Sequence, residues 1–230
     1  MLKIYIGWDS HEIPAYNALV KSLKKHNPEL TAEPLKTDRL QAAGLLRRTV
    51  DNRGQMYDLP SGAPCSTEFA ASRFLVPLIC QSGWAMFLDC DMLFMDDPME
   101  IMQYADSSKA VMVVKHNHAG IEHDKMGGMA QTQYPRKNWS SVILFNCDHS
   151  ANKRLSLDDV NNRPGRDLHA FYWLHDSEIG DLPREWNWLV NVQPKPEHPK
   201  IGHWTLGGPW IPGWKPQPYD DLWLKSANSY

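Results

Sequence analysis

The sequence has few cysteines, no long apolar run and no excess of positive charge. Its 4 cysteines are widely spaced and form no C-x-x-C pair, which argues against a zinc knuckle or a disulfide framework and fits a reducing compartment. No apolar run approaches the length of a transmembrane helix, and the apolar start of the chain is too short for the core of a signal peptide. We therefore expect a cytoplasmic protein, with peripheral membrane contact left open.

An excess of positive charge and internal repetition are also missing. The formal net charge of −3 provides no basic field that would attract nucleic acid, so we expect no nucleic-acid partner. The sequence contains no internal repeat and no low-complexity tract, which argues against a solenoid or an array of small units.

What is present suits one globular domain. The chain has 230 residues, of which 42% are hydrophobic and 22% charged, enough for a single α/β core. Its 10 tryptophans lie mostly in the second half, where they can fill a core or form platforms for sugar rings. We expect one domain over residues 1–210 and an irregular tail rich in Trp and Pro over 211–230, packed on the domain or extending from it.

Apolar segments alternate with amphipathic ones over the first half of the chain. The strands that we expect cover residues 2–6, 32–37, 84–88, 110–114, 142–145 and 186–192. The helices that we expect cover residues 13–26, 67–82 (kinked at Pro77), 98–104 and 168–174, and residues 38–64 are expected to be mainly loop. This alternation predicts an α/β fold with a mostly parallel sheet that binds ligands at the carboxyl ends of its strands.

The most informative feature is a pair of aspartates directly after a wholly apolar segment. Residues 84–88 read as a strand buried on both faces, and Asp89-Cys90-Asp91 follows. Residues i and i+2 of an extended chain point to the same side, so Asp89 and Asp91 can converge on one point. Two carboxylates there favour a divalent cation, and oxygen ligands suit Mg²⁺ or Mn²⁺. The alternative is a surface turn, and we assign the nearby Asp96 and Asp97 to helix capping.

Residues 87–91 resemble the D-x-D element of GT-A fold glycosyltransferases. The nearest resemblance is to the retaining family 8, which includes glycogenin and the bacterial lipooligosaccharide galactosyltransferases. Five further segments resemble blocks of that family in the same order: residues 4–9 with Tyr16, 72–74, 140–146, 175–187 and 203–210. The chain is thus identified as a divergent member, with a GT-A, Rossmann-like sheet flanked by helices. Gly208 stands where the family has a lysine, so Lys125, Lys137 or Arg73 would have to meet the diphosphate.

The resemblance also implies a set of site residues. The metal ligands would be Asp89, Asp91 and His203, holding Mn²⁺ or Mg²⁺. Trp8, Asp9 and Tyr16 would contact the nucleotide, and Arg73 and Asp89 would contact the rest of the donor. From the residues alone, Arg73 could pair with donor phosphate, with Asp89 or with Glu68.

The same resemblance assigns the remaining catalytic positions and the reaction. Asp176 would position the sugar in the transfer, beside Ser177, which stands where the family has glutamine. We therefore expect a metal-dependent transfer, with retention, of a sugar from a nucleotide-sugar donor such as a UDP-sugar. The acceptor would be a hydroxyl group of a glycan, a lipid-linked molecule or a small molecule. The alternatives are a sugar-phosphate nucleotidyltransferase and a non-catalytic nucleotide- or carbohydrate-binding protein.

Overall fold

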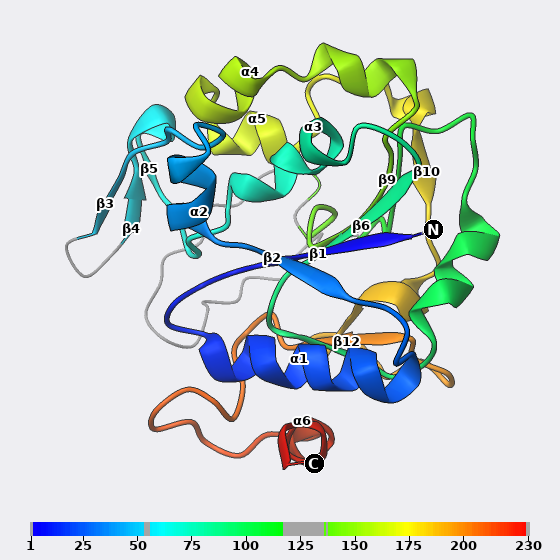
Figure 1. Ribbon diagram of the computed structural model, residues 1–230. Coiled ribbons are helices and arrows are strands. Elements are labelled where there is room, and N and C mark those ends of the chain that lie inside the picture. The colour runs from blue at the N-terminus through cyan, green and yellow to red at the C-terminus, as the bar shows by residue number, and fades with distance from the viewer. Residues whose placement is uncertain (1, 53–55, 117–135, 137, 229–230) are drawn as a thin grey trace.

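The computed structural model describes residues 2–52, 56–116, 136 and 138–228, and its centre is a six-stranded sheet (Figure 1). The strands lie in the order β10 (Ile179–Asp181), β8 (Val111–Val113), β9 (Val142–Asn146), β6 (Trp84–Leu88), β1 (Lys3–Gly7) and β2 (Ala32–Leu35). Only β9 runs antiparallel to its neighbours in this sheet. The expected mostly parallel sheet is therefore confirmed.

The sheet is buried because helices cover both of its faces. The side chains of β6 and β9 are nearly all inaccessible to solvent, as expected for apolar strands packed on both sides. In Figure 1, α1 (Ile13–His26) lies on one face, while α3 (Val76–Cys80), α4 (Leu157–Asn162) and α5 (Gly165–His169) lie on the other. Short 3₁₀ helices cover Leu59–Ser61, Ser72–Leu75, Pro98–Tyr104, Ser150–Arg154, Asp176–Glu178 and Arg184–Asn187.

A second, three-stranded sheet continues from the end of β6. Its order is β11 (Trp188–Leu189), β12 (Ile201–His203) and β7 (Met92–Phe94), and β12 is antiparallel to β7. The register pairs His203 with Met92, so the end of β12 lies beside the residue that precedes β7. This pairing sets the position of Asp91 relative to His203.

The structure corrects the prediction that residues 38–64 are mainly loop. They include most of α2 (Thr37–Ala42) and a small antiparallel sheet of β3 (Val50–Asn52), β4 (Met56–Asp58) and β5 (Ala63–Pro64). A buried ion pair holds this region, with Arg48 Nε 2.7 Å from one Asp58 oxygen and Arg48 Nη2 2.6 Å from the other. The strands are too short to show an alternating pattern, so long-range contacts rather than local sequence define them.

The helix predicted over residues 67–82, with its kink at Pro77, needs correction as well. The helix expected over residues 67–82 is a 3₁₀ turn, Ser72–Leu75, followed by the short α3. Pro77 lies in the first turn of α3, where its missing N–H costs nothing, so it begins a helix instead of kinking one. Asp97 does cap the turn over Pro98–Tyr104, since its side chain accepts a hydrogen bond from the Met99 N–H.

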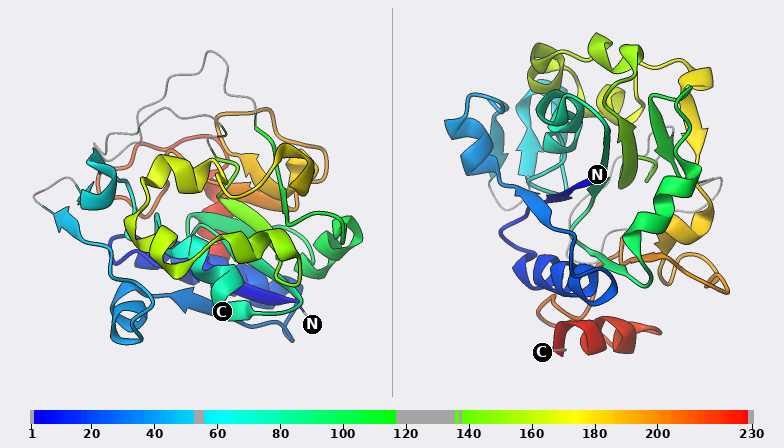
Figure 2. Two further views of the ribbon diagram at one scale, coloured as in Figure 1. Left: turned by 90° about the horizontal axis from the view of Figure 1, so that it is seen from above. Right: turned by 45° about the vertical axis from the view of Figure 1, so that its right-hand side comes forward.

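The end of the chain folds back on α1. Residues 211–219 are irregular as expected, whereas α6 (Asp220–Asn228) is a helix that the sequence pattern did not suggest. It packs beside α1 (Figures 1 and 2), and Lys21 Nζ donates to the Ala227 carbonyl at 2.7 Å. Trp223 of α6 is buried with Trp188 and Trp204 in a cluster separate from the main core.

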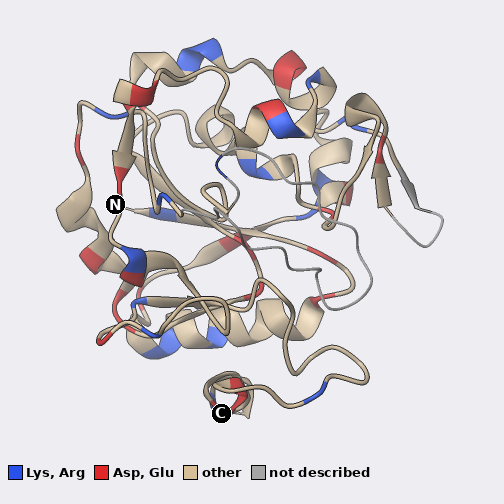
Figure 3. Ribbon diagram, turned by 180° about the vertical axis from the view of Figure 1, so that it is seen from behind, with Lys and Arg blue, Asp and Glu red and all other residues tan. Residues whose placement is uncertain are grey.

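Two features remain: where the charged residues lie, and whether a helix could cross a membrane. Acidic and basic residues both occur on the elements at either side of the sheet (Figure 3). Among the helices in the described part of the chain, none combines the length and the apolar character that a membrane crossing requires.

Candidate active site

The candidate site begins at the carboxyl end of β6, where the chain leaves the central sheet. Asp89 and Asp91 flank Cys90, which is fully buried and donates a hydrogen bond from Sγ to Glu12 Oε2 at 3.2 Å. Burial, together with the nearby Glu12 and Asp91 charges, holds the pKa of the Cys90 thiol well above its usual range. This thiol is thus a neutral, inward-facing group, and the two aspartates line the pocket instead.

His203 joins the two aspartates through the β7–β12 pairing. Its Nε2 atom lies 3.4 Å from Asp91 Oδ1, and the side chains of both residues are buried. One ligand atom each from Asp89, Asp91 and His203 lies within 4.8 Å of the others. The structure therefore brings the three predicted metal ligands together, and we call them the metal triad.

The donor set of the metal triad fits a divalent cation. Two carboxylates and one imidazole, converging at the edge of a sheet, are oxygen and nitrogen ligands of the kind that Mn²⁺ accepts. A cation there would offset the cost of holding two carboxylates close together. Mg²⁺ fits the oxygen ligands as well.

Arg73 is a basic residue that contacts the metal triad. Its Nη1 atom lies 2.8 Å from Asp89 Oδ1 and donates to the Ser140 carbonyl at 2.7 Å. The guanidinium lies 5.2 Å from the centre of the Phe69 ring and 5.0 Å from that of Phe87, within the range of cation–π contacts. Of the two protein side chains considered from the sequence as partners of Arg73, the structure shows Asp89 in contact with it. Glu68 accepts hydrogen bonds from Ser10 instead.

A pocket of about 250 Å³ extends from the metal triad between the small β3–β4–β5 sheet and α5. Arg73 contacts the metal triad through Asp89 and donates to the Ser140 carbonyl, and Ser141, Arg48 and His169 also line the pocket. Burial, with the charges of Arg73 and Arg48, holds the pKa of His169 well below its usual range, so the ring is neutral. Its Nδ1 atom lies 2.6 Å from Ser140 Oγ.

Sequence reasoning missed Arg48 and His169. Arg48 lies in a segment that was expected to be loop, and His169 lies in a short helix whose facing neighbours come from distant positions. No local motif marks either residue, and only the topology brings them to the same pocket.

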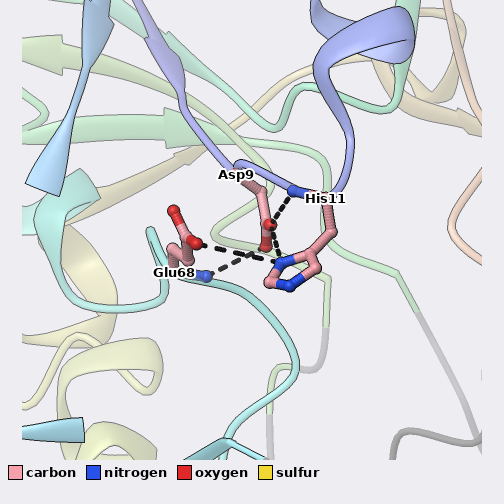
Figure 4. Close-up of side chains that lie close together, drawn as sticks. All are labelled: Asp9, His11 and Glu68. Carbon is pink, nitrogen blue, oxygen red and sulfur yellow. Dashed lines mark hydrogen bonds and ion pairs between the residues drawn. The ribbon is translucent and has the colours of Figure 1, made fainter. Parts of the chain in front are cut away.

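The loop after β1 is tied to the segment that precedes Arg73 (Figure 4). Asp9 is buried, and its carboxylate accepts from the Glu68 N–H at 3.1 Å and from the His11 N–H at 2.9 Å. The hydrogen bond with Asp9 raises the pKa of His11. Asp9, His11 and Glu68 also offer atoms within 4.8 Å of one another, but the Asp9 oxygens already accept backbone N–H groups. This cluster holds the loop in place.

Trp8 and Tyr16, the other residues expected at the nucleotide, contact each other. Their rings meet edge to face with centroids 4.8 Å apart, and Lys36 Nζ lies 3.8 Å from the centroid of the Trp8 ring. In the described part of the chain the pocket lining includes Glu68 but not Trp8, Asp9 or Tyr16. Trp8 and Asp9 directly follow β1, and Tyr16 lies in the first turn of α1.

The two predicted catalytic residues lie apart from the metal triad. Asp176 has a side chain that is 90% exposed and forms an ion pair with Arg136. The Ser177 carbonyl accepts from Lys109 Nζ at 2.8 Å. Neither residue is among the described residues that line the pocket, so their assignment stays a prediction.

The position of the missing family lysine has a steric explanation. A Cβ atom on Gly208 would lie 2.2 Å from the Trp210 ring, so no side chain fits there unless Trp210 moves. Of the substitutes considered, Lys125 and Lys137 lie outside the described residues. Arg73 is the one that the structure places at the pocket.

A sequence comparison finds one close match along the whole chain. No protein-family model matches the sequence. The chain is 41% identical over 237 residues to "Protein CDI" of Arabidopsis thaliana, covering 99% of this chain and 86% of the relative.

Solved structures with a similar fold are glycosyltransferases. The galactosyltransferase LgtC, solved with donor and acceptor sugar analogs, gives a TM-score of 0.59 at 16% identity, over 99% of this chain and 95% of LgtC. The bifunctional glycosyltransferase WbbM gives 0.59 at 13% identity, over 99% of this chain and 49% of WbbM. GlyE of Streptococcus pneumoniae TIGR4 gives 0.58 at 11% identity, over 100% of this chain and 62% of GlyE. At these identities the likeness shows the fold, which is GT-A.

Proposed function

This chain belongs to the family of the Arabidopsis thaliana protein CDI, and we propose that it is a metal-dependent glycosyltransferase with a nucleotide-sugar donor. The observation that carries the proposal is the convergence of Asp89, Asp91 and His203 at the carboxyl edge of a GT-A sheet. In α/β sheets of this type, ligands bind outside the carboxyl ends of the strands. The membership in retaining family 8 that we expect from the motifs remains part of the proposal.

The proposed donor is a sugar nucleotide, with uridine diphosphate as its expected leaving group. LgtC, which has the same fold, was solved with donor and acceptor sugar analogs, and this supports a site for both substrates. We place the nucleotide near Trp8, which follows β1, and Tyr16 of α1, whose aromatic rings contact each other. The acceptor would be a hydroxyl of a glycan, a lipid-linked molecule or a small molecule.

The residues of the site suit departure of a diphosphate. When bound, Mn²⁺ or Mg²⁺ would supply charge stabilisation for that leaving group. Asp89, Asp91 and His203 would hold the ion, and Arg73 would add a fixed positive charge at the same edge of the pocket. Retention would require the acceptor to approach from the leaving-group side, with a phosphate oxygen taking the acceptor's proton. Asp176 and Ser177 are proposed to position the sugar, which requires them to reach it.

Calorimetry with UDP, with and without Mn²⁺, tests the metal role directly. Wild-type protein should bind UDP at least 10-fold more tightly with Mn²⁺, and Asp91→Ala should lose this dependence because it removes a buried ligand. A matched control is Asp148→Ala, since Asp148 accepts from the Gly83 N–H at the opposite end of β6. The metal role is wrong if Asp91→Ala keeps the dependence that the wild type shows.

Slow hydrolysis of a UDP-sugar separates an enzyme from a non-catalytic binder. An enzyme should release free sugar in a Mn²⁺-dependent reaction, whereas a binder leaves the donor intact. The nucleotidyltransferase alternative would need a Gly-rich, basic loop after the first strand, and residues 7–11 contain one glycine and no lysine or arginine.

A further inference from the structure

A chain of buried hydrogen bonds leads from the metal triad to Asn187. This residue ends the turn Arg184–Asn187 and is 0% exposed. Its Oδ1 atom lies 3.0 Å from His203 Nδ1. Its Nδ2 atom donates to Ser141 Oγ at 2.9 Å and to the Asn138 carbonyl at 3.3 Å.

The surroundings fix which way the Asn187 amide points. A backbone carbonyl can only accept, so the group that faces Asn138 must be the amide NH₂. Ser141 Oγ donates its own hydrogen to the same carbonyl at 2.7 Å and is therefore free to accept from Asn187. The amide oxygen of Asn187 must then face His203.

This orientation determines the tautomer of His203. An amide oxygen accepts but cannot donate, so the Nδ1 atom of His203 must carry a hydrogen. In the neutral ring the lone pair is then on Nε2, and that atom faces Asp91 Oδ1 at 3.4 Å. A divalent cation bound by both atoms would use the Nε2 lone pair and this carboxylate oxygen, and Nε2 is the nitrogen with which this ring can bind a metal.

We propose that Asn187 is a positioning residue of the metal triad, which fixes the Nδ1–H tautomer of His203 and so directs the Nε2 lone pair at the ion. The inference rests on the proposed function, since it assumes that the triad binds a divalent cation. Asn187 touches neither the ion nor a substrate. It acts through the ring that it holds.

The protein offers a matched control for this residue. Asn152 is also a buried asparagine, and its Nδ2 atom donates to the carbonyls of Ala110 and Asn146 at 2.9 and 2.8 Å. Its Oδ1 atom accepts from Trp173 Nε1 at 3.2 Å. Asn152 therefore makes a similar set of hydrogen bonds without contacting the metal triad.

The test is Mn²⁺ affinity of the protein without donor or acceptor, measured by the free-Mn²⁺ signal in electron paramagnetic resonance. Asn187→Ala should weaken Mn²⁺ binding by roughly 10–100-fold, the usual effect of losing the partner of a metal-binding histidine. Asn152→Ala should change it by less than about twofold, although both variants lose stability through similar hydrogen bonds. Thermal unfolding of both variants checks that they are folded at the temperature of the measurement.

A second variant separates positioning from packing. Asn187→Asp keeps an acceptor for the His203 Nδ1–H but loses the donors to Ser141 and Asn138. Positioning predicts that Asn187→Asp binds Mn²⁺ more tightly than Asn187→Ala does, even if it is less stable. In the neutral His203 ring of the metal-free wild type, nitrogen NMR shifts should show Nδ1 protonated and Nε2 unprotonated.

The outcomes separate this inference from the proposed function. If the wild type and Asp91→Ala bind Mn²⁺ equally, the metal-dependent function is wrong and the inference falls with it. If the wild type binds Mn²⁺ and Asp91→Ala does not, while Asn187→Ala binds as the wild type does, only the inference is overturned. An Nε2–H tautomer in the wild type overturns it as well.

Discussion

The contact between Arg73 and Asp89 joins a buried positive charge to a proposed metal ligand. The guanidinium lies beside two phenylalanine rings and donates to the Ser140 carbonyl, so it has little freedom to move. A rigid cation at this edge of the pocket can offset negative charge on a departing diphosphate without reorganising.

Arg73→Met should therefore reduce catalysis more than it reduces folding. We expect a loss of about 100-fold in kcat/KM for donor hydrolysis, the order found when one preorganised electrostatic contact is removed. Arg154→Met is the control, because Arg154 pairs with Glu178 away from the pocket lining. Equal rates in the two variants would remove Arg73 from the proposed site.

Gly7 shows how one residue sets the approach of two segments. A Cβ atom at this position would lie 2.4 Å from the Phe69 ring, which is buried against the end of β1. We expect Gly7→Ala to cost about 1–3 kcal/mol of unfolding free energy through overpacking, measured by urea denaturation. In a Phe69→Leu background the same change should cost less, since the smaller side chain relieves the contact; an equal cost would contradict the steric explanation.

At the residue scale, the sequence predicted which residues carry the chemistry better than it predicted the contacts of those residues. Asp89 and Asp91 could be identified because an apolar strand precedes them, and His203 because of the motif that it begins. Asn187 matched a motif too, but its hydrogen bond to His203 depends on the β11–β12 pairing and could not be inferred. Asp9 is buried with backbone partners, a position that depends on the fold of residues 64–71.

Among the elements, α4 is fixed by a capping box. Ser156 Oγ accepts from the Asp159 N–H at 3.0 Å, and the Asp159 carboxylate accepts from the Ser156 N–H at 3.0 Å. Ser156→Ala should lower the unfolding free energy by about 1 kcal/mol, because it leaves an N–H of the first turn without its cap. Chemical denaturation measures this change, and a loss below about 0.3 kcal/mol would mean that the cap contributes little.

The capping box of α4 should also make the stability of the protein depend on pH, because it contains Asp159. Burial opposes ionisation of Asp159, but hydrogen bonds from Ser156 and Arg163 outweigh it and lower the pKa of Asp159 to about 2. A carboxylate with a folded-state pKa below its ordinary 3.8 stabilises the protein above pH 3.8, and this contribution is lost as the pH falls towards 2. Urea unfolding between pH 2 and 5 should show Asp159→Asn less stable than the wild type by about 1 kcal/mol at pH 5. The difference should shrink towards pH 2.

The prediction of strands and helices succeeded where the chain is apolar and failed where tertiary contacts determine the secondary structure. Five of the six central strands were expected, four of them from buried apolar segments, whereas β10 lies in a motif block that was not read as a strand. The β3–β4–β5 sheet has strands of two or three residues, held by the buried pair of Arg48 and Asp58, and no local pattern marks them. Helix α6 was missed because the preceding Pro- and Trp-rich segment suggested an irregular end.

For the whole molecule, the packing of α6 on α1 buries the second tryptophan cluster. Trp223 contacts the cluster that contains Trp204, the neighbour of His203 in sequence. Trp223→Ala should cost about 3 kcal/mol of unfolding free energy, as for other large buried aromatic residues. Leu224→Ala on the same helix is the control, because Leu224 is 44% exposed and should change stability by less than about 0.5 kcal/mol. Equal effects of the two changes on thermal unfolding would show that α6 is not an integral part of the fold.

The pairing of β7 with β12 has a consequence for how the protein is made. During synthesis, Asp89 and Asp91 emerge from the ribosome long before His203. Strand β7, which pairs with the strand of His203, is therefore complete before β12 is made. A nascent chain released before β12 would carry the two aspartates without the imidazole opposite them. Retention on an immobilised Mn²⁺ or Ni²⁺ matrix would not report this, but binding of Mn²⁺ in solution would distinguish finished molecules from prematurely terminated ones.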